Sequence, residues 1–204
     1  MSIYHYHLTP QSLNLIQKFK SLMKHTRGRI FSLLYLKAKA KKLKISSNVE
    51  IWGEIEFGNN IFIGSGVKIY LNTILDNNVY LGDNVEIRGV SKTKITIGKN
   101  TTVNRGSIII GEVLIGNDCL IAPLCVISGS NHDFSELNIN INKQGAIFKG
   151  ITLKDNVWLG AHVTVLDGVT IGKNSVIGAG SVVTKNIPKN SIAVGNPCQV
   201  IKTR

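Results

Sequence analysis

Large apolar residues recur at every sixth position along most of the chain, in three successive registers. The members are Ile51, Phe57, Ile63, Ile69, Leu75, Leu81 and Ile87, then Ile97, Val103, Ile109, Ile115, Ile121 and Ile127, then Leu153, Leu159, Val165, Ile171, Ile177 and Val183. A second ladder of mostly smaller or β-branched residues precedes each of them by two positions. Because residues two apart share one face of a strand, the pattern predicts short strands with a narrow shared interior.

The turns between these strands recur with the same period. Gly-x-Asn occurs at 82–84, 98–100 and 172–174, and the pairs Asn60/Asn78 and Asn156/Asn174 are each eighteen residues apart. Glycine and asparagine tolerate positive φ angles, which a sharp corner requires. Three six-residue sides give eighteen residues per coil. The sequence therefore predicts an all-β fold, a parallel solenoid of about six triangular coils.

Two insertions and two flanking segments interrupt the repeat. The step from Ile87 to Ile97 is four residues too long, and the step from Ile127 to Leu153 predicts a protruding loop near residues 129–149. Long loops on rigid scaffolds are often functional. Apolar residues at helical spacing between Gln11 and Leu43 predict amphipathic helices. We therefore divide the chain into a helical N-terminal segment (1–46), the repeat domain (47–186) and a C-terminal tail (187–204).

The net charge of +12 is concentrated at the N-terminus. Residues 1–49 contain ten Lys or Arg and no acid, while the rest of the chain is nearly neutral. A basic amphipathic segment can bind an anionic membrane surface, or it can cap the open end of the solenoid. Nucleic-acid binding is not expected, because neither aromatic residues nor a motif accompany the charge.

The cysteines and the lack of a signal-peptide pattern predict a cytoplasmic protein. It would be peripheral on the inner face of the membrane if the N-terminal segment binds lipid. Cys119, Cys125 and Cys198 are an odd number without metal-like spacing, which favours a reducing compartment. No apolar stretch of signal-peptide or membrane-spanning length is present. The repeat region holds only His132 and His162, so a three-histidine zinc site is not expected.

His132 is the candidate catalytic group. It opens the predicted loop in the segment Ser128-Gly-Ser-Asn-His-Asp-Phe134. Imidazole is the side chain best matched to proton transfer near neutral pH. A thioester donor is already activated, so a hydroxyl acceptor needs only a base and donors for the developing oxyanion. A solvated loop histidine without a catalytic role is the alternative interpretation.

The last third of the chain carries a specific family resemblance. Its segments are Asn156-Val-Trp-Leu-Gly-Ala161, Val165-Leu-Asp-Gly-Val-Thr-Ile-Gly172, Val176-Ile-Gly-Ala-Gly-Ser-Val-Val-Thr-Lys185 and Gly195-Asn-Pro-Cys-Gln-Val-Ile201. With the His132 segment, they resemble the maltose, galactoside and nodulation-factor O-acetyltransferases and their relatives in polysaccharide biosynthesis, all hexapeptide-repeat enzymes. The likeness covers roughly residues 48–202. It implies a left-handed β-helix and a homotrimer with each active site between two subunits.

The resemblance also implies roles for individual residues. His132 matches the catalytic histidine, and Asn104 an asparagine that contacts the acceptor. Asp133 is assigned to the acceptor side, and is one candidate, with Glu136 or a backbone carbonyl, for orienting His132. Seven residues match positions on the cofactor side of the family's site, namely Trp158, Gly160, Ala161, Ala179, Thr184, Lys185 and Lys202. The tail has Asn196-Pro-Cys198 where the family has Asn-Pro-Ala, and the N-terminal segment is longer and more basic than in the small-sugar enzymes.

The resulting functional hypothesis is an O-acetyltransferase that moves an acetyl group from acetyl-CoA to a sugar hydroxyl, without a metal, in surface polysaccharide or capsule biosynthesis. Three alternatives stay open at this stage. The acceptor can be the amine of an amino sugar or nucleotide-sugar, and the donor can be an acyl carrier protein. The chain can also be a repeat scaffold without catalytic activity.

Overall fold

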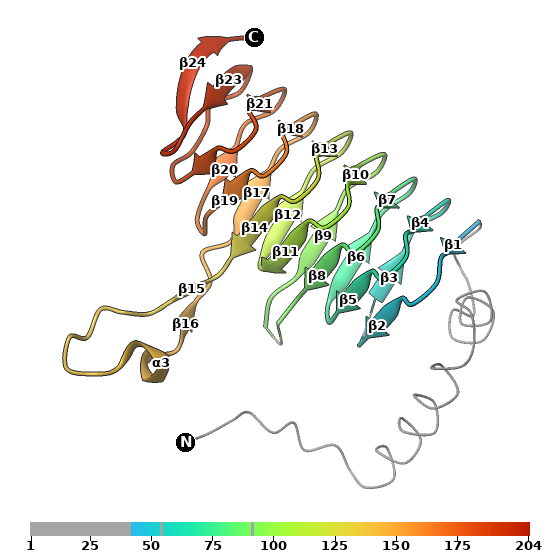
Figure 1. The fold of residues 1–204 in the computed structure, drawn as a ribbon, viewed down its shortest axis with the longest axis horizontal. Coiled ribbons are helices and arrows are strands. Elements are labelled where there is room, and N and C mark those ends of the chain that lie inside the picture. Colours follow the sequence, from blue (N-terminus) through green and yellow to red (C-terminus); the bar gives the residue numbers. More distant parts are fainter. Residues whose placement is uncertain (1–41, 54, 91) are drawn as a thin grey trace, which may run out of the picture.

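The computed structural model describes residues 42–53, 55–90 and 92–204. The helices predicted within residues 1–46 therefore lie outside the described residues, apart from the final stretch 42–46. The described chain is a solenoid whose three faces are parallel sheets, which confirms the predicted all-β architecture (Figure 1).

Each sheet takes one strand from most coils, and sheet A ends with an additional antiparallel strand, β24 (Gln199–Thr203). Sheet A contains β1 (Lys44–Ile45), β4 (Phe62–Ile63), β7 (Tyr80–Leu81), β10 (Thr102–Val103), β13 (Leu120–Ile121), β18 (Trp158–Leu159), β21 (Val176–Ile177), β23 (Ser191–Val194) and β24 (Gln199–Thr203). Sheet B contains β2 (Glu50–Trp52), β5 (Lys68–Tyr70), β8 (Glu86–Arg88), β11 (Ile108–Gly111), β14 (Val126–Gly129), β19 (Thr164–Val165) and β22 (Val182–Val183). Sheet C contains β3 (Ile55–Phe57), β6 (Thr73–Leu75), β9 (Ile95–Ile97), β12 (Val113–Ile115), β17 (Ile151–Leu153) and β20 (Thr170–Ile171).

The register between coils follows the predicted period. Phe62 pairs with Tyr80 and Thr102 with Leu120, each eighteen residues apart, whereas Leu120 pairs with Trp158 across the long insertion. The solenoid has about eight turns, two more than expected. The extra strands are β1, which precedes the first ladder position, and β23, which continues sheet A into the segment assigned to the tail. The left-handed sense stays a prediction.

The two ladders form the core. Every position of the large ladder is buried except Phe57, and every position of the smaller ladder except Val49 and Ile55. These three exceptions belong to the first coil, which among the described residues has a neighbouring coil on one side only. Polar ladder residues are buried with their hydrogen bonds satisfied, as expected for an interior. For example, Thr101 Oγ1 donates to the carbonyl of Gly116 at 2.9 Å and accepts the N–H of Cys119 at 3.1 Å.

Asparagine occupies the corner between sheets C and A in most coils. The residues with φ between +56° and +62° at this corner are Asn60, Asn78, Asn100, Asp118, Asn156, Asn174 and Asn190. Their side chains also bond along the solenoid: Asn60 Nδ2 donates to Asn78 Oδ1 at 3.0 Å, and Asn156 Nδ2 donates to Asn174 Oδ1 at 2.9 Å. The predicted corner role is therefore confirmed, and the carboxamides add a second ladder of hydrogen bonds.

The predicted long loop is a projecting hairpin, which we define as residues 130–149. It leaves sheet B after β14 and returns to sheet C at β17, and it extends away from the solenoid (Figure 1). It contains β15 (Asn131–His132), α3 (Ile141–Gln144) and β16 (Ala146–Ile147). Its strands are antiparallel, so the hairpin is a separate two-stranded ribbon.

Candidate active site

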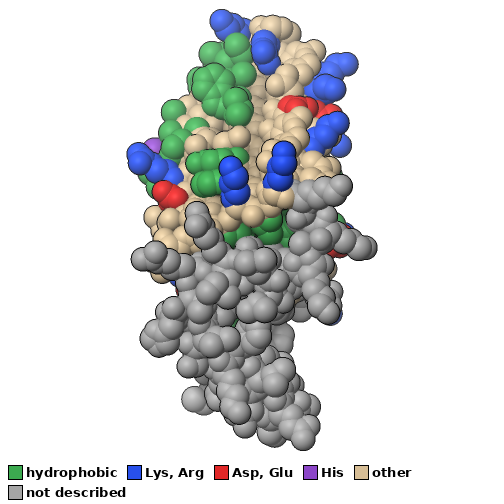
Figure 2. Space-filling model, turned by 90° about the vertical axis from the view of Figure 1, so that its right-hand side faces the viewer, with side chains coloured by type: hydrophobic (Ala, Val, Ile, Leu, Met, Phe, Trp, Pro, Cys, Tyr) green, Lys and Arg blue, Asp and Glu red, His purple; other side chains and the backbone are tan. Residues whose placement is uncertain are grey.

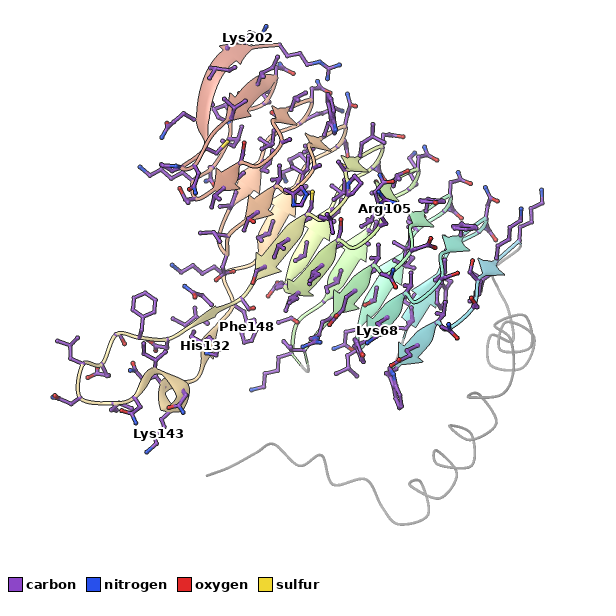
Figure 3. All side chains as sticks on the ribbon, viewed as in Figure 1. Lys68, Arg105, His132, Lys143, Phe148 and Lys202 are labelled. Atoms are coloured by element: carbon purple, nitrogen blue, oxygen red, sulfur yellow. The ribbon has the colours of Figure 1, made fainter. Side chains whose placement is uncertain are left out.

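His132 lies on the first strand of the projecting hairpin. It pairs with Ala146 of β16, and its backbone N–H donates to the Asn131 side-chain oxygen at 2.9 Å. The side chain is exposed (Figure 3). Within the described part of the chain, the imidazole forms no hydrogen bond. The ring is therefore held by its strand and is accessible to a molecule that approaches the hairpin.

The carboxylate of Asp133 is bonded within its own loop. Its carboxylate accepts the Ser135 N–H at 3.0 Å, and this backbone hydrogen bond, followed by one from the Ser135 side chain, lowers the pKa of Asp133. Gln144 orders the hairpin tip by bonding both the N–H and the carbonyl of Glu136, each at 2.9 Å. No hydrogen bond joins Asp133 or Glu136 to His132 among the described residues.

Asn104 lies at the corner between sheets A and B, directly after β10. Its Nδ2 donates to the carbonyl of Ile121 on the next coil at 2.9 Å, and its backbone N–H donates to the same oxygen at 2.9 Å. These two bonds fix the orientation of the side chain. The amide oxygen accepts no hydrogen bond from the described residues, so it can accept one from a hydroxyl group of another molecule.

Trp158 is half-exposed on the outer surface of sheet A, at 51%. In its cross-strand row it stands between Leu120 and Val176, and the row continues through Ile192 to Lys202 on β24. Strands are about 4.8 Å apart, so the three steps from Trp158 to Lys202 cover roughly 14 Å. The tryptophan and the lysine therefore lie on one continuous surface, with an apolar middle and a basic end.

Gly160, Ala161 and Ala179 meet at the A–B corner of two successive coils. The Gly160 N–H donates to Ile177 within the ladder, at 2.8 Å. The N–H groups of Ala161 and Ala179, by contrast, have no acceptor among the described residues. Gly160 is buried, and a Cβ added to it would lie 2.6 Å from the Ala179 nitrogen, so only glycine lets the two coils pack this closely here. Among the described residues, the corner thus has two amide donors without an acceptor, at positions whose side chains are only methyl groups.

Thr184 and Lys185 lie at a different corner of the solenoid from Gly160, Ala161 and Ala179. Both are exposed and follow β22, at the corner between sheets B and C. The projecting hairpin leaves the solenoid at this same kind of corner, two coils earlier. The predicted site residues therefore fall into two groups. Asn104, Trp158, Gly160, Ala161, Ala179 and Lys202 lie on sheet A or the A–B corner, whereas His132, Asp133, Thr184 and Lys185 lie on the side of the B–C corner.

A single chain does not bring these two groups together. One full face of the prism, sheet B, separates the two corners, and the hairpin points away from the body (Figure 3). With about six residues per side at about 3.3 Å each, the corners are roughly 15–20 Å apart. The sequence identified the candidate residues, but nothing in the periodicity predicted this separation.

The sequence reasoning missed the apolar character of the projecting hairpin. Its exposed apolar residues are Phe134, Leu137, Ile139, Ile141, Ile147 and Phe148, and Leu137 is 97% exposed. Patches of apolar side chains also lie on the solenoid, among Lys and Arg side chains (Figure 2). The signal was present in the sequence, since these residues belong to neither ladder and so have no place in the solenoid core. Large exposed apolar surfaces commonly mark contact sites.

The remaining ionisable groups of the described chain form no competing site. No group of three or more His, Cys, Asp or Glu residues is close enough to hold a metal ion among the described residues. Cys119, Cys125 and Cys198 are buried, and desolvation raises the pKa of each thiol. Nor does any described helix have the length and apolar character needed to cross a membrane.

Comparison with known proteins gives acetyltransferases among the similar sequences. The chain is 44% identical over 113 residues to the galactoside O-acetyltransferase of Escherichia coli K12, an alignment that covers 54% of each chain. The chain spans about half the length of the curated relatives it matches.

Two solved structures share the fold. One is a hexapeptide-repeat acetyltransferase of Vibrio cholerae O1 biovar eltor complexed with acetyl-coenzyme A. Its TM-score is 0.56 and its identity 25%, over 64% of this chain and 70% of that one. The other is the polySia specific acetyltransferase NeuO, with a TM-score of 0.60 and 28% identity, over 80% of this chain and 74% of that one.

The family model "Bacterial transferase hexapeptide (six repeats)" matches residues 150–185. These residues begin where the projecting hairpin ends, and they include Trp158, Gly160, Ala161 and Ala179. The solenoid, its six-residue period and these likenesses agree with one another. The chain therefore belongs to the hexapeptide-repeat acetyltransferase family.

Proposed function

We propose that this protein is an acetyl-CoA-dependent O-acetyltransferase whose acceptor is a sugar hydroxyl. The observation that carries the proposal is the A–B corner near Trp158, where the N–H groups of Ala161 and Ala179 have no acceptor among the described residues. Backbone donors beside small side chains suit a narrow amide-containing chain such as the pantetheine arm of coenzyme A. The relative of Vibrio cholerae, solved with acetyl-coenzyme A, supports this donor.

The reaction is a direct transfer within a ternary complex. The free imidazole nitrogen of His132 accepts the proton of the sugar hydroxyl as the oxygen attacks the thioester carbonyl carbon. A backbone N–H stabilises the resulting oxyanion. When the intermediate collapses, the carbon–sulfur bond breaks and His132 returns its proton to the leaving thiolate. The products are the acetylated sugar and free coenzyme A.

The active site is completed by a second copy of the chain, in a homotrimer. Two observations support this assembly: His132 and the A–B corner lie on opposite sides of sheet B, and the projecting hairpin exposes apolar residues such as Phe134 and Leu137. A heterologous contact, in which the hairpin of one copy reaches the A–B corner of the next, closes into a ring. Three copies then form three equivalent sites.

Mixing two inactive variants tests this assembly. His132→Ala removes the base, and Ala179→Phe places a bulky side chain on the exposed corner without entering the core. We expect each variant alone to be inactive. When the two variants are refolded together in equal amounts, they should assemble into trimers at random. Half of the chains then carry an intact base and the other half an intact corner, so about a quarter of the sites should combine the two. No recovery of activity, in trimers shown to be mixed by mass, would mean that each site lies within one chain.

The proposal also concerns the kind of molecule that accepts the acetyl group. A role in surface polysaccharide synthesis is supported by the likeness to the polySia specific acetyltransferase and by the basic N-terminal segment. The experiment is release of coenzyme A from acetyl-CoA across sugars, nucleotide-sugars, amino sugars and oligosaccharides, with His132→Ala as the control. Release with hydroxyl acceptors that depends on His132 supports O-acetylation. Release confined to amines and largely independent of His132 would favour N-acetylation instead.

A further inference from the structure

The projecting hairpin is joined to the solenoid at two places, and both are bonded to one residue of the preceding coil. The carbonyl of Gly129, where the hairpin begins, accepts the Glu112 N–H at 3.1 Å. The Ile151 N–H, just after the hairpin ends, donates to the Glu112 carbonyl at 2.9 Å. There is no room for a side chain at the first of these places, since a Cβ on Gly129 would lie 2.1 Å from the Glu112 oxygen. Backbone contacts therefore fix where the hairpin starts and ends.

The following coil adds a carboxylate. Oδ1 of Asp167 accepts the N–H of Gly150 at 2.8 Å and the N–H of Lys149 at 3.1 Å, while Oδ2 also accepts the Lys149 N–H at 3.1 Å. Gly168 reinforces the contact, because its N–H donates to the Gly150 carbonyl at 3.0 Å. Hydrogen bonds to an ionised acceptor are stronger than neutral ones. Asp167 thus holds two consecutive peptides at the point where the hairpin returns.

The position of Asp167 follows from the sheet register. It lies two residues beyond β19, whose Val165 pairs with Ile127 of β14. Continuing this register by two residues places Asp167 beside Gly129, where the hairpin leaves the solenoid. The carboxylate therefore belongs to the part of the solenoid from which the hairpin leaves, and it binds the two peptides at which the hairpin returns.

The bonded peptides are linked to His132 through the ribbon. His132 pairs with Ala146, which is three residues before Lys149. In an extended strand this separation is roughly 10 Å, so a tilt of about 10° at Lys149 would displace His132 by more than 1 Å. Catalysis is sensitive to displacements of this size.

We propose that Asp167 is a positioning residue for His132: its carboxylate sets the angle at which the projecting hairpin leaves the solenoid. This inference rests on the proposed function, because it assigns Asp167 a part in the transfer of the acetyl group. Asp167 itself touches neither the substrates nor the imidazole. It acts through the peptides of Lys149 and Gly150.

The test compares three variants of the full chain. Asp167→Ala removes both acceptor oxygens, and Asp167→Asn keeps an amide oxygen that can replace Oδ1. Asp83→Ala is the matched control, since Asp83 Oδ1 accepts the Ser65 N–H at 2.8 Å in an early coil without a link to the hairpin. Trypsin cleavage after Lys143 and Lys149 measures the order of the hairpin, independently of activity. Steady-state kinetics measure turnover.

We expect Asp167→Ala to be cleaved at least 5-fold faster in the hairpin and to lose about 10-fold in kcat with little change in the KM for acetyl-CoA. Asp167→Asn and Asp83→Ala should retain the wild-type cleavage rate and kcat. Unchanged cleavage in Asp167→Ala would overturn the anchoring role, and faster cleavage with unchanged kcat would overturn the positioning role. If the wild type shows no transfer with any acceptor, the proposed function fails, while the cleavage rates still decide whether Asp167 anchors the hairpin.

Discussion

Gly160 lies directly against the backbone nitrogen of Ala179, at a distance that leaves no space for a methyl group. We expect Gly160→Ala to destabilise the protein by about 1–3 kcal/mol, the usual cost of overpacking, and to raise the KM for acetyl-CoA. Gly58→Ala is the matched control, because a Cβ there would lie 2.6 Å from the Asn77 nitrogen at another corner. Thermal unfolding should fall in both variants. An equal effect of both on KM would contradict a cofactor role for the A–B corner.

Replacement of His132 should separate catalysis from folding. Because the side chain is exposed and forms no hydrogen bond with the described residues, His132→Ala should leave the unfolding temperature unchanged. Loss of a general base should lower kcat by about 10²–10⁴. Circular dichroism and steady-state kinetics measure the two effects. Near-normal turnover in this variant would exclude His132 as the base.

The three thiols should react slowly in the native protein. Burial raises the pKa of Cys119, Cys125 and Cys198 above the ordinary value of 9.0, which lowers the fraction of thiolate at any given pH. Since the thiolate is the nucleophile, labelling by an aromatic disulfide reagent at pH 8 should be slow in buffer and rapid for all three in denaturant. Fast labelling of any one thiol in the folded protein would contradict its burial.

The same pKa shifts make stability depend on pH. The raised pKa of a folded thiol means that above about pH 9 the unfolded state loses protons that the folded state retains. This contribution to stability is therefore complete below pH 9 and is lost as the pH rises further. Urea unfolding between pH 7 and pH 10.5 should show the decline. Replacement of Cys119 by Ser or Ala should make the decline smaller.

The corner asparagines should be replaced more easily by glycine than by alanine. Asn174 has a φ of +62°, donates to Asn190 Oδ1 and accepts from Asn156, each at 2.9 Å. Asn174→Ala loses both bonds and keeps a Cβ in the left-handed region, so we expect a cost of about 2–3 kcal/mol. Asn174→Gly loses the bonds without the strain and should cost about half as much. Equal losses in urea unfolding would show that the backbone angle contributes nothing.

Charge complementarity makes a prediction for the N-terminal segment. Residues 45–87 contain six acids and one base, directly after the ten bases of residues 1–49. Within the first coil, the core positions Val49, Ile55 and Phe57 are only half-buried. A chain that starts at residue 42 should therefore aggregate or lose several degrees of unfolding temperature if the segment covers this end. A stable, active truncation that no longer binds vesicles with anionic lipids would instead support membrane binding.

The fold was largely predictable because every coil repeats the same constraint. A strand side with one large and one small inward residue can occupy only one register, so ladder positions such as Ile109 and Ser107 could be assigned directly. The number of turns was underestimated, because the register was started at Ile51 although Ile45 of β1 continues it, and because β23 pairs with β21 at a separation of sixteen residues and so leaves the register. Helices within residues 1–46 stay a prediction.

The candidate site was predictable as a set of residues and not as an arrangement. The segment around His132 and the glycine at position 160 are recognisable in the sequence, because chemistry and close packing restrict those positions. The distance between His132 and the A–B corner depends on which corner the hairpin leaves, and no local pattern encodes that. The contacts of Asp167 were likewise hidden, since its acceptor role depends on a segment eighteen residues away that belongs to neither ladder.

The last strand, β24, has a consequence for the length of the molecule. A stack of parallel coils has no intrinsic end, and its final edge is a template on which another chain can continue the sheet. On sheet A, β24 runs antiparallel to β23 with a shift in register after Ile192, and it carries the basic residue Lys202. A reversed, irregular and charged final strand does not match the first strand of a neighbouring molecule. It therefore acts as a stop against end-to-end fibre growth.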